Sequence, residues 1–205
     1  MDQTEGKRRI VRPRDAAGMI VLRERGSAVE VLLGVRAGTH RFMPNRLAFP
    51  GGSVERRDYS ATAASTLAPA TEAMLDKAAR PGLANALAMA AARELAEETG
   101  LSLGKPPALA GLFYLCRAIT PADLPIRFHA RFLVIPAATL DGRLGGSGEL
   151  EGLGFYGLDD PALAALPWIT ARVLSELATW LRLPPAMRTG IRRTAVYRNR
   201  VRREE

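Results

Sequence analysis

The chain has 205 residues, of which 47% are hydrophobic, and this length suits one domain with a sizeable core. No uninterrupted apolar run approaches the length of a bilayer span, and the charged start lacks a signal-peptide core, so we expect no membrane segment and a cytoplasmic protein. A single cysteine, Cys116, excludes an internal disulfide and a multi-cysteine metal site.

The net charge of +8 is concentrated at the two ends of the chain. Residues 1–14 carry five basic and two acidic groups, and residues 186–205 carry seven arginines and two glutamates. Charge runs are most often solvated surface, and the C-terminal run has one aromatic residue and no recognised binding pattern. We therefore do not expect nucleic acid as a partner. The predicted organisation is a basic segment over 1–15, one domain over 16–184 and a basic tail over 185–205.

The first half of the domain begins with two strand-like runs. Residues 18–23 and 29–36 are rich in β-formers and are separated by a turn-like segment, which predicts a hairpin. A loop rich in turn residues then leads to Pro50-Gly51-Gly52. Residues 59–82 differ in composition and contain a short helical pattern, so we interpret them as an insertion with a helical piece of its own.

The second half alternates helical and strand-like patterns. Residues 83–99 are rich in Ala, Leu and Glu, and Gly100 stands where a glycine would end a helix. Strands are predicted next, and then two helices over 161–167 and 169–183. The predicted later strands cover residues 108–119, 127–136 and 152–158. This order indicates an α/β or α+β layered domain.

Three glutamates share one face of the predicted central helix. Glu94, Glu97 and Glu98 are spaced i, i+3 and i+4 near the negative end of the helix dipole, where like charges are unfavourable. One interpretation is an exposed acidic face with Arg93 as a partial counter-ion. The other is a site for Mg²⁺ or Mn²⁺, which require clustered hard oxygen ligands.

The neighbouring residues favour the metal site, because "RELAEETGL" at 93–101 matches the second half of the Nudix box, G-x5-E-x7-R-E-U-x-E-E-x-G-U. The first half is present as Gly52, five residues, and Asp58 in place of Glu. Between Asp58 and Arg93 lie 34 residues rather than seven, which places the interruption in the segment 59–82. The sequence thus resembles a Nudix hydrolase, which implies an α/β/α sandwich with a mixed central sheet.

The resemblance extends to the coenzyme A diphosphatase-like branch, whose box carries a long insertion. Its pattern L-L-T-x-R-[SA]-x3-R-x3-G-x3-F-P-G-G falls on this chain with its spacing intact, although Gly34 replaces Thr and Asn45 replaces Gly. The matching positions include the candidate substrate-binding residues Arg36, Arg41, Phe49, Gly51 and Gly52. Guanidinium groups bind phosphates bidentately, which suits the two arginines.

The resemblance implies metal-dependent hydrolysis of a nucleoside diphosphate linked to another group. Coenzyme A or acyl-coenzyme A is the favoured substrate, and ADP-ribose or a nucleotide sugar is the alternative within the enzyme class. Glu94, Glu97 and Glu98 are the expected metal ligands, and Arg93 is expected to orient them. The general base is left open between Glu97, Glu149 and Glu151.

A non-enzymatic alternative is a Nudix-like nucleotide sensor that binds nucleic acid through its basic ends. Such a sensor predicts damaged metal ligands, whereas all the box glutamates are present in this chain. The sequence therefore favours an enzyme with a small-molecule nucleotide diphosphate as its substrate. A homodimer is an open alternative to a monomer.

Overall fold

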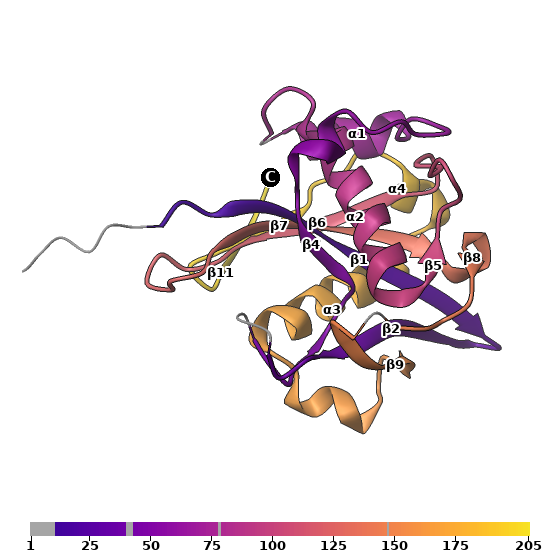
Figure 1. The fold of residues 1–205 in the computed structure, drawn as a ribbon, viewed down its shortest axis with the longest axis vertical. Coiled ribbons are helices and arrows are strands. Elements are labelled where there is room, and N and C mark those ends of the chain that lie inside the picture. Colours follow the sequence, from indigo (N-terminus) through magenta and orange to yellow (C-terminus); the bar gives the residue numbers. More distant parts are fainter. Residues whose placement is uncertain (1–10, 40–42, 78, 147) are drawn as a thin grey trace, which may run out of the picture.

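A mixed nine-stranded sheet forms the centre of the molecule (Figure 1). The computed structural model describes residues 11–39, 43–77, 79–146 and 148–205. The main path of the sheet runs in the order β11-β10-β6-β7-β1-β2-β3, with β4 paired to β1 and β9 paired to β2. Its strands are β1 (Arg14–Arg25), β2 (Ala28–Arg36), β3 (Leu47–Ala48), β4 (Gly51–Ser53), β6 (Phe113–Ile119), β7 (Phe128–Pro136), β9 (Leu150–Gly157), β10 (Ala195–Arg198) and β11 (Val201–Glu204).

Three of the α-helices in the described part of the chain lie on the two faces of this sheet. α1 (Pro69–Asp76) and α2 (Leu83–Thr99) pack on one face, and α3 (Trp168–Leu181) packs on the other; α4 (Pro185–Thr189) leads toward β10. Two short strands, β5 (Leu101–Ser102) and β8 (Asp141–Gly142), pair separately. The short 3-10 helices of the described chain are η1 (Arg56–Tyr59), η2 (Ala137–Thr139) and η3 (Pro161–Ala165). The predicted α/β/α sandwich with a mixed sheet is confirmed.

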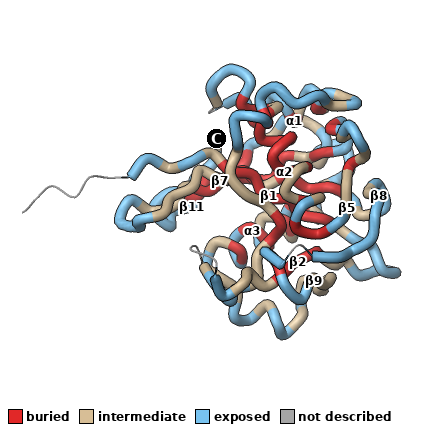
Figure 2. Tube along the Cα trace, in the orientation of Figure 1, coloured by how far each residue is buried: buried red, intermediate tan, exposed pale blue. Residues whose placement is uncertain are grey.

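Alternation along β1 explains why both faces of the sheet are covered. Met19 and Val21 belong to the core cluster under α1 and α2, whereas Ile20 belongs to the cluster under α3. Successive side chains of a strand point to opposite faces, so a continuous apolar run requires a layer on each side. The buried segments consequently concentrate in the sheet and in the helix faces against it (Figure 2).

The predicted hairpin and central helix are confirmed. β1 and β2 pair in antiparallel register, with Arg25 opposite Ala28 at the turn. α2 ends at Gly100, whose φ of 73° lies in the left-handed region and whose N–H donates to the carbonyl of Ala96. Glycine reaches this conformation without a steric penalty, which explains why the helix ends there.

Residues 59–82 contain a helix of their own, which packs into the core. Met74 and Leu75 on α1 are buried in the same cluster as α2. The hydroxyl of Thr71, also buried, donates to the carbonyl of Leu112 at 2.8 Å. This segment is therefore anchored by apolar contacts and a buried hydrogen bond.

The basic C-terminal segment differs from the predicted tail. β10 pairs in parallel with β6, and Ala195, Val196 and Tyr197 are buried, so the segment completes the sheet. The turn between β10 and β11 has positive φ at Asn199 and Arg200, as a two-residue hairpin turn requires. Ala195, Val196 and Tyr197 are too short a run within an arginine-rich segment to predict a strand from the sequence.

The predicted helix over 161–167 is also shorter than expected. Only Pro161–Ala165 forms a 3-10 turn, which the side chain of Asp160 caps by accepting from the N–H of Ala162. Pro167 immediately precedes α3 and disfavours helical geometry in the residue before it, so the turn cannot continue.

Among the described residues, no helix is long and apolar enough to span a bilayer.

Candidate active site

The face of α2 that carries the glutamates lies against Gly51 and Gly52, the glycines with which β4 begins. The three carboxylates differ in exposure, because Glu98 is 2% exposed, the side chain of Glu94 is 13% exposed and that of Glu97 is 50% exposed. Glu94 and Glu98 are four residues apart on α2, so their side chains project from the same face toward the Gly51–Gly52 turn. The side chain of Glu97 reaches solvent. Solvent exposure therefore increases across the site from Glu98 to Glu97.

Backbone geometry at the glycine turn lets the carboxylates approach closely. The N–H of Gly51 donates to Oε2 of Glu98 at 2.7 Å. A Cβ at Gly51 would lie 2.3 Å from the carbonyl oxygen of Ala17, and its φ of +149° also disfavours a side chain. A Cβ at Gly52 would lie 2.3 Å from Oε1 of Glu94. Glycine is required at both positions for this packing.

Arg93 connects the two halves of the box. Its Nε and Nη2 donate to the two carboxylate oxygens of Asp58 at 3.0 and 3.1 Å, and Asp58 is buried. The backbone N–H of Glu55 also donates to Asp58, at 2.7 Å. Nη1 of Arg93 donates to Glu94 at 2.7 Å and to Glu97 at 3.2 Å. One guanidinium thus holds three carboxylates in fixed relative positions.

The electrostatics of this arrangement keep Arg93 charged. Burial alone would lower the pKa of Arg93, but the hydrogen bonds to Asp58 and Glu94 outweigh it and hold the pKa above its ordinary value. The guanidinium therefore acts as a permanent positive centre beside the glutamates.

Sequence reasoning missed Arg57, which binds the exposed edge of the site. Its Nη2 lies 3.4 Å from Oε1 of Glu97, and its Nε lies 2.8 Å from Oε2 of Glu55. The only sequence signal was its position next to Asp58 in the first half of the box. Glu97 therefore has two guanidinium partners, Arg57 and Arg93.

Burial and like charge oppose ionisation of Glu98. The pKa of Glu98 is raised to about 7, mainly by burial and in smaller part by the charges of Glu94 and Glu149. The N–H of Gly51 and the charge of Arg36 act in the opposite direction and favour the carboxylate. Glu98 consequently exchanges a proton near neutral pH in the absence of a cation.

At Glu94, too, burial and like charges raise the pKa while a cationic partner lowers it, and the net rise is smaller than at Glu98. Burial raises its pKa, Arg93 lowers it, and Glu97 and Glu149 raise it again. A carboxylate that is partly desolvated and surrounded by others is stabilised by any added cation.

The donor chemistry of the site fits a hard divalent cation. Glu94, Glu97 and Glu98 offer carboxylate oxygens, which Mg²⁺ and Mn²⁺ prefer. Among the described residues, no three acidic, histidine or cysteine side chains already converge in metal-binding geometry. Hydrogen bonds explain this spread, because Arg93 binds Glu94 and Glu97 while Gly51 binds Glu98. The carboxylates fit the ion by donor type, and holding it jointly requires the three side chains to leave their present hydrogen bonds to Arg93 and Gly51.

The two candidate general bases occupy different environments. Glu149, just before β9, is exposed, and its backbone carbonyl accepts from the N–H of Ala37 at 3.1 Å. Its charge raises the pKa of both Glu94 and Glu98, so it lies within electrostatic range of the site. Glu151 is exposed on β9 opposite Val35 and is not among the main groups that shift those pKa values.

The predicted substrate-binding residues divide into three groups. Gly51 and Gly52 form the turn against the glutamates, and Arg36 ends β2 within electrostatic range of Glu98. Phe49 is buried in the core under α3, where its ring meets Phe132 edge-to-face at 6.1 Å. The structure therefore places the Phe49 side chain in the core rather than beside the glutamates. Arg41 lies outside the described residues.

Comparison with known proteins relates this geometry to solved structures. Neither a family model nor a curated protein matches the sequence. A Nudix hydrolase structure from Alicyclobacillus acidocaldarius is 26% identical, with a TM-score of 0.61 over 80% of this chain and 90% of that chain.

Two more distant structures show the same fold. A MutT Nudix hydrolase from Burkholderia pseudomallei is 21% identical, with a TM-score of 0.52 over 82% of this chain and 99% of that chain. The Nudix domain of NrtR from Shewanella oneidensis, solved in complex with ADP ribose, is 13% identical, with a TM-score of 0.50 over 87% of this chain and 94% of that chain. The chain thus has the Nudix fold, and its likeness to the Nudix hydrolase from Alicyclobacillus acidocaldarius supports a hydrolase.

Proposed function

We propose that the protein hydrolyses the diphosphate bond of a nucleoside diphosphate linked to a second group, with coenzyme A or acyl-coenzyme A as its substrate. The observation that carries the proposal is the packing of Glu94 and Glu98 against the Gly51–Gly52 turn, with Glu97 beside them and Arg93 bound to Asp58. These are hard oxygen donors on one face of α2 whose present orientation is fixed by hydrogen bonds.

Mg²⁺ or Mn²⁺ held by Glu94, Glu97 and Glu98 would supply charge neutralisation and Lewis-acid polarisation at the diphosphate. The protein itself supplies orientation. Arg93, anchored on the buried Asp58, holds Glu94 and Glu97 so that their oxygens remain on one side of α2. The raised pKa of Glu98 reflects a partly desolvated pocket, in which electrostatic interactions with phosphate oxygens are stronger than in water.

The chemical step is attack of water on one phosphorus of the diphosphate. A new P–O bond forms, the bond from that phosphorus to the bridging oxygen breaks, and the bridging oxygen leaves with the other phosphate. We assign Glu149 to accept the proton of the water, because it is exposed and lies within electrostatic range of both Glu94 and Glu98. Glu97 and Glu151 are the alternatives that mutagenesis must separate.

The coenzyme A assignment rests on the sequence pattern that ends at the glycine turn and on Arg36. The guanidinium of Arg36 belongs to the strand end beside Glu98 and suits a phosphate of the substrate. The NrtR domain was solved with ADP ribose, so this compound is the principal competitor to include in any test.

A substrate panel tests this function. Purified protein with Mg²⁺ or Mn²⁺ is incubated with coenzyme A, acetyl-coenzyme A, ADP-ribose, NADH and a dinucleoside polyphosphate, and products are separated by chromatography. We expect coenzyme A to yield 4′-phosphopantetheine and 3′,5′-ADP, with kcat/KM at least tenfold above that for ADP-ribose.

Four variants serve as controls for that panel. Glu97→Gln and Glu98→Gln should each lower kcat by at least about a hundredfold while the protein remains folded, since each removes a ligand oxygen charge. Glu151→Gln should lower kcat by less than Glu149→Gln. Preferential turnover of ADP-ribose would reject the coenzyme A assignment, and no turnover of any diphosphate would reject the enzyme.

A further inference from the structure

A concave site separate from the glutamates lies between α3 and the C-terminal hairpin. Its volume is about 430 Å³, and none of its lining residues belongs to the box or the glycine turn. Trp168, Arg172 and Glu176 line it from α3, and Tyr197, Arg200 and Arg202 line it from β10, the hairpin turn and β11. We call these six residues the aromatic–arginine groove.

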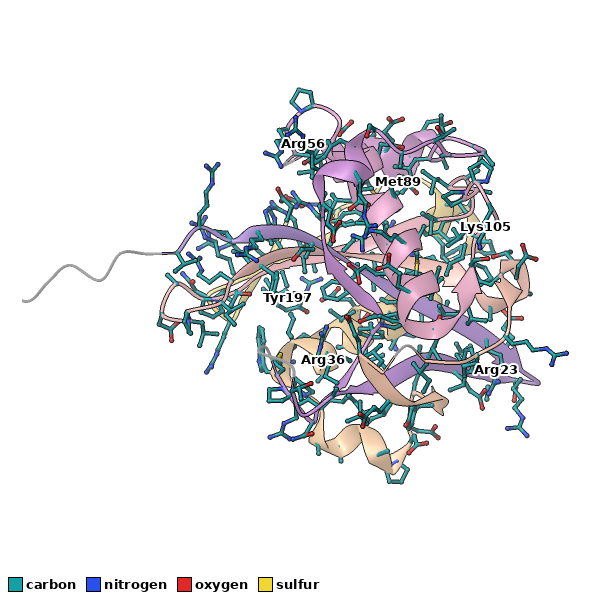
Figure 3. The ribbon with its side chains drawn as sticks, in the orientation of Figure 1. Arg23, Arg36, Arg56, Met89, Lys105 and Tyr197 are labelled. Atoms are coloured by element: carbon teal, nitrogen blue, oxygen red, sulfur yellow. The ribbon has the colours of Figure 1, made fainter. Side chains whose placement is uncertain are left out.

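Aromatic rings form one wall of the aromatic–arginine groove. Trp168 is 39% exposed, an unusual state for so large an apolar side chain. Its ring meets the ring of Tyr197 edge-on, with centroids 5.6 Å apart and an interplanar angle of 90°. Figure 3 shows Tyr197 between the strands and α3. Tyr197 thus fixes the indole in place while leaving part of it open to a ligand.

Positive charge in the groove exceeds negative charge. Glu176 is fully engaged, because it accepts from Tyr197 Oη at 2.6 Å and from Nε and Nη2 of Arg202 at 2.6 and 3.2 Å. Arg172 and Arg200 have no carboxylate within 4.0 Å among the described residues. Arg172 instead lies over the Trp168 ring, 5.8 Å from its centroid. Two guanidinium groups are therefore available to anions beside an exposed indole.

The combination of an open aromatic ring and spaced guanidinium groups matches the chemistry of a nucleic acid strand. Bases stack on aromatic side chains, and guanidinium groups bind backbone phosphates. Arg172 projects from a helix and Arg200 from a hairpin turn, so the two cations belong to opposite sides of the groove. Such spacing suits several phosphates of one strand better than the single phosphate of a mononucleotide.

Two other roles explain less of the geometry. Arginines on an edge strand protect it from pairing with another chain, but that role does not require Arg172 or an exposed Trp168 on a helix. An anionic membrane surface attracts arginines, but insertion into it requires projecting apolar side chains, whereas the Trp168 indole lies in a concave site.

We propose that the aromatic–arginine groove binds single-stranded nucleic acid, with a base stacked on Trp168 and phosphates bound by Arg172 and Arg200. This binding does not depend on the proposed diphosphatase activity, because the groove shares no residue with the glutamate site. This proposal departs from the expectation from sequence that nucleic acid is not a partner, because the fold brings α3 and the C-terminal arginines together.

Fluorescence anisotropy of a labelled twelve-nucleotide single strand tests the proposal. Wild-type protein should bind at low salt, with affinity falling as salt is added. The double variant Arg172→Ala/Arg200→Ala should bind at least tenfold more weakly at about 100 mM salt and show a shallower salt dependence, by roughly 1.4 in the log–log slope if two phosphates are lost.

A matched control separates groove binding from loss of net charge. The double variant Arg25→Ala/Arg143→Ala removes the same charge from exposed positions outside the groove and should change affinity less than twofold. Equal weakening by the two double variants would contradict the proposal, since binding would then follow net charge alone. Circular dichroism confirms that each variant is folded.

Tryptophan emission tests the stacking contact independently. The two tryptophans differ in exposure, because Trp168 is open and Trp180 is 7% exposed. Addition of the single strand should quench the emission of wild-type protein, and Trp168→Phe should lose most of that quenching. Trp168→Ala should weaken binding about tenfold, as expected for loss of one stacked base. Quenching that persists in Trp168→Phe would place the strand elsewhere.

Three ligands complete the test. A mononucleotide and a DNA duplex of the same length should bind at least tenfold more weakly than the single strand, because neither offers both unstacked bases and successive phosphates. Vesicles containing anionic phospholipid should not compete with the strand. Equal binding of the duplex, or displacement of the strand by vesicles, would overturn the proposal in favour of a general anionic surface.

Discussion

At the scale of single residues, Glu98 shows most clearly how burial and charge are balanced in the site. Its side chain accepts one hydrogen bond from Gly51 and lies within range of Glu94, Glu149 and Arg36. Because a carboxylate with a raised pKa is protonated in part at neutral pH, metal binding and proton release at Glu98 are coupled.

We predict a pH-dependent metal affinity that Glu98 controls. The pKa of about 7 means that a cation must displace a proton at lower pH, so the apparent affinity for Mn²⁺ should fall about tenfold per pH unit below 7 and level off above it. Isothermal titration calorimetry between pH 5.5 and 8.5 measures this. Glu98→Gln should bind more weakly with little pH dependence; an unchanged slope in this variant would assign the proton to another group.

The same shift predicts how stability changes in metal-free protein. The pKa of Glu98 is raised from 4.5 to about 7 in the folded state, so the folded protein holds an extra proton between these values. Stability from this group is therefore present below about pH 4.5 and is lost as pH rises through 7, by an amount on the order of 3 kcal/mol. Denaturant unfolding with a chelator should show this decline, and Glu98→Gln should remove it.

At the scale of elements, the site depends on how closely α2 approaches β4. The absence of a side chain at Gly52 leaves the space that the Glu94 carboxylate fills. Arg93 on α2 then reaches across to Asp58 in η1 and ties the helix to the segment after β4. The sequence separates these parts by a long segment, and the fold brings them together.

Gly52→Ala should impair the site more than the fold. The new Cβ would lie 2.3 Å from Oε1 of Glu94, and the carboxylate must move because a real contact of that length does not occur. We expect kcat to fall about a hundredfold, as a misplacement of about 1 Å can cause. Gly145→Ala is the matched control, since its Cβ would have no neighbour nearer than 4.0 Å. Steady-state kinetics measure kcat for both variants. An equal fall in kcat for Gly52→Ala and Gly145→Ala would contradict the steric explanation.

Docking of α1 gives a stability prediction. Thr71→Val removes a buried hydroxyl that donates to the Leu112 carbonyl and leaves that acceptor without this partner, which should cost about 1–3 kcal/mol in unfolding free energy. Thr139→Val removes an exposed hydroxyl with the same bond length to Pro136 and should cost less than about 0.5 kcal/mol. Urea unfolding compares the two. No loss in Thr71→Val would mean that α1 is not held against the core.

At the scale of the whole molecule, long periodic elements were the most predictable from the sequence. The helix over 83–99 and its glycine stop were predicted to the residue, because composition and capping agree locally. The first hairpin was predicted because two β-rich runs flank a short turn. Spacing placed the three glutamates on one helix face, since i, i+3 and i+4 positions share it, and the resemblance to the Nudix box then favoured a metal site over an exposed acidic face.

Features that depend on tertiary pairing were not predictable. β10 has four residues within an arginine-rich segment, and its strand state comes from pairing with β6. Phe49 belongs to a substrate pattern in sequence, yet its ring lies in the core against Phe132, in the cluster under α3. Short segments lack periodicity, so their conformation and the direction of their side chains depend on distant partners.

The central claim is that Glu94, Glu97 and Glu98 together hold a divalent cation. Anomalous diffraction from crystals soaked in Mn²⁺ tests it most directly, because the ion is then located independently of activity. We predict a strong anomalous peak bounded by these three carboxylates, with ligand distances of roughly 2.0–2.3 Å. Full-occupancy Mn²⁺ elsewhere on the protein, with the three side chains still bound to Arg93 and Gly51, would contradict the account.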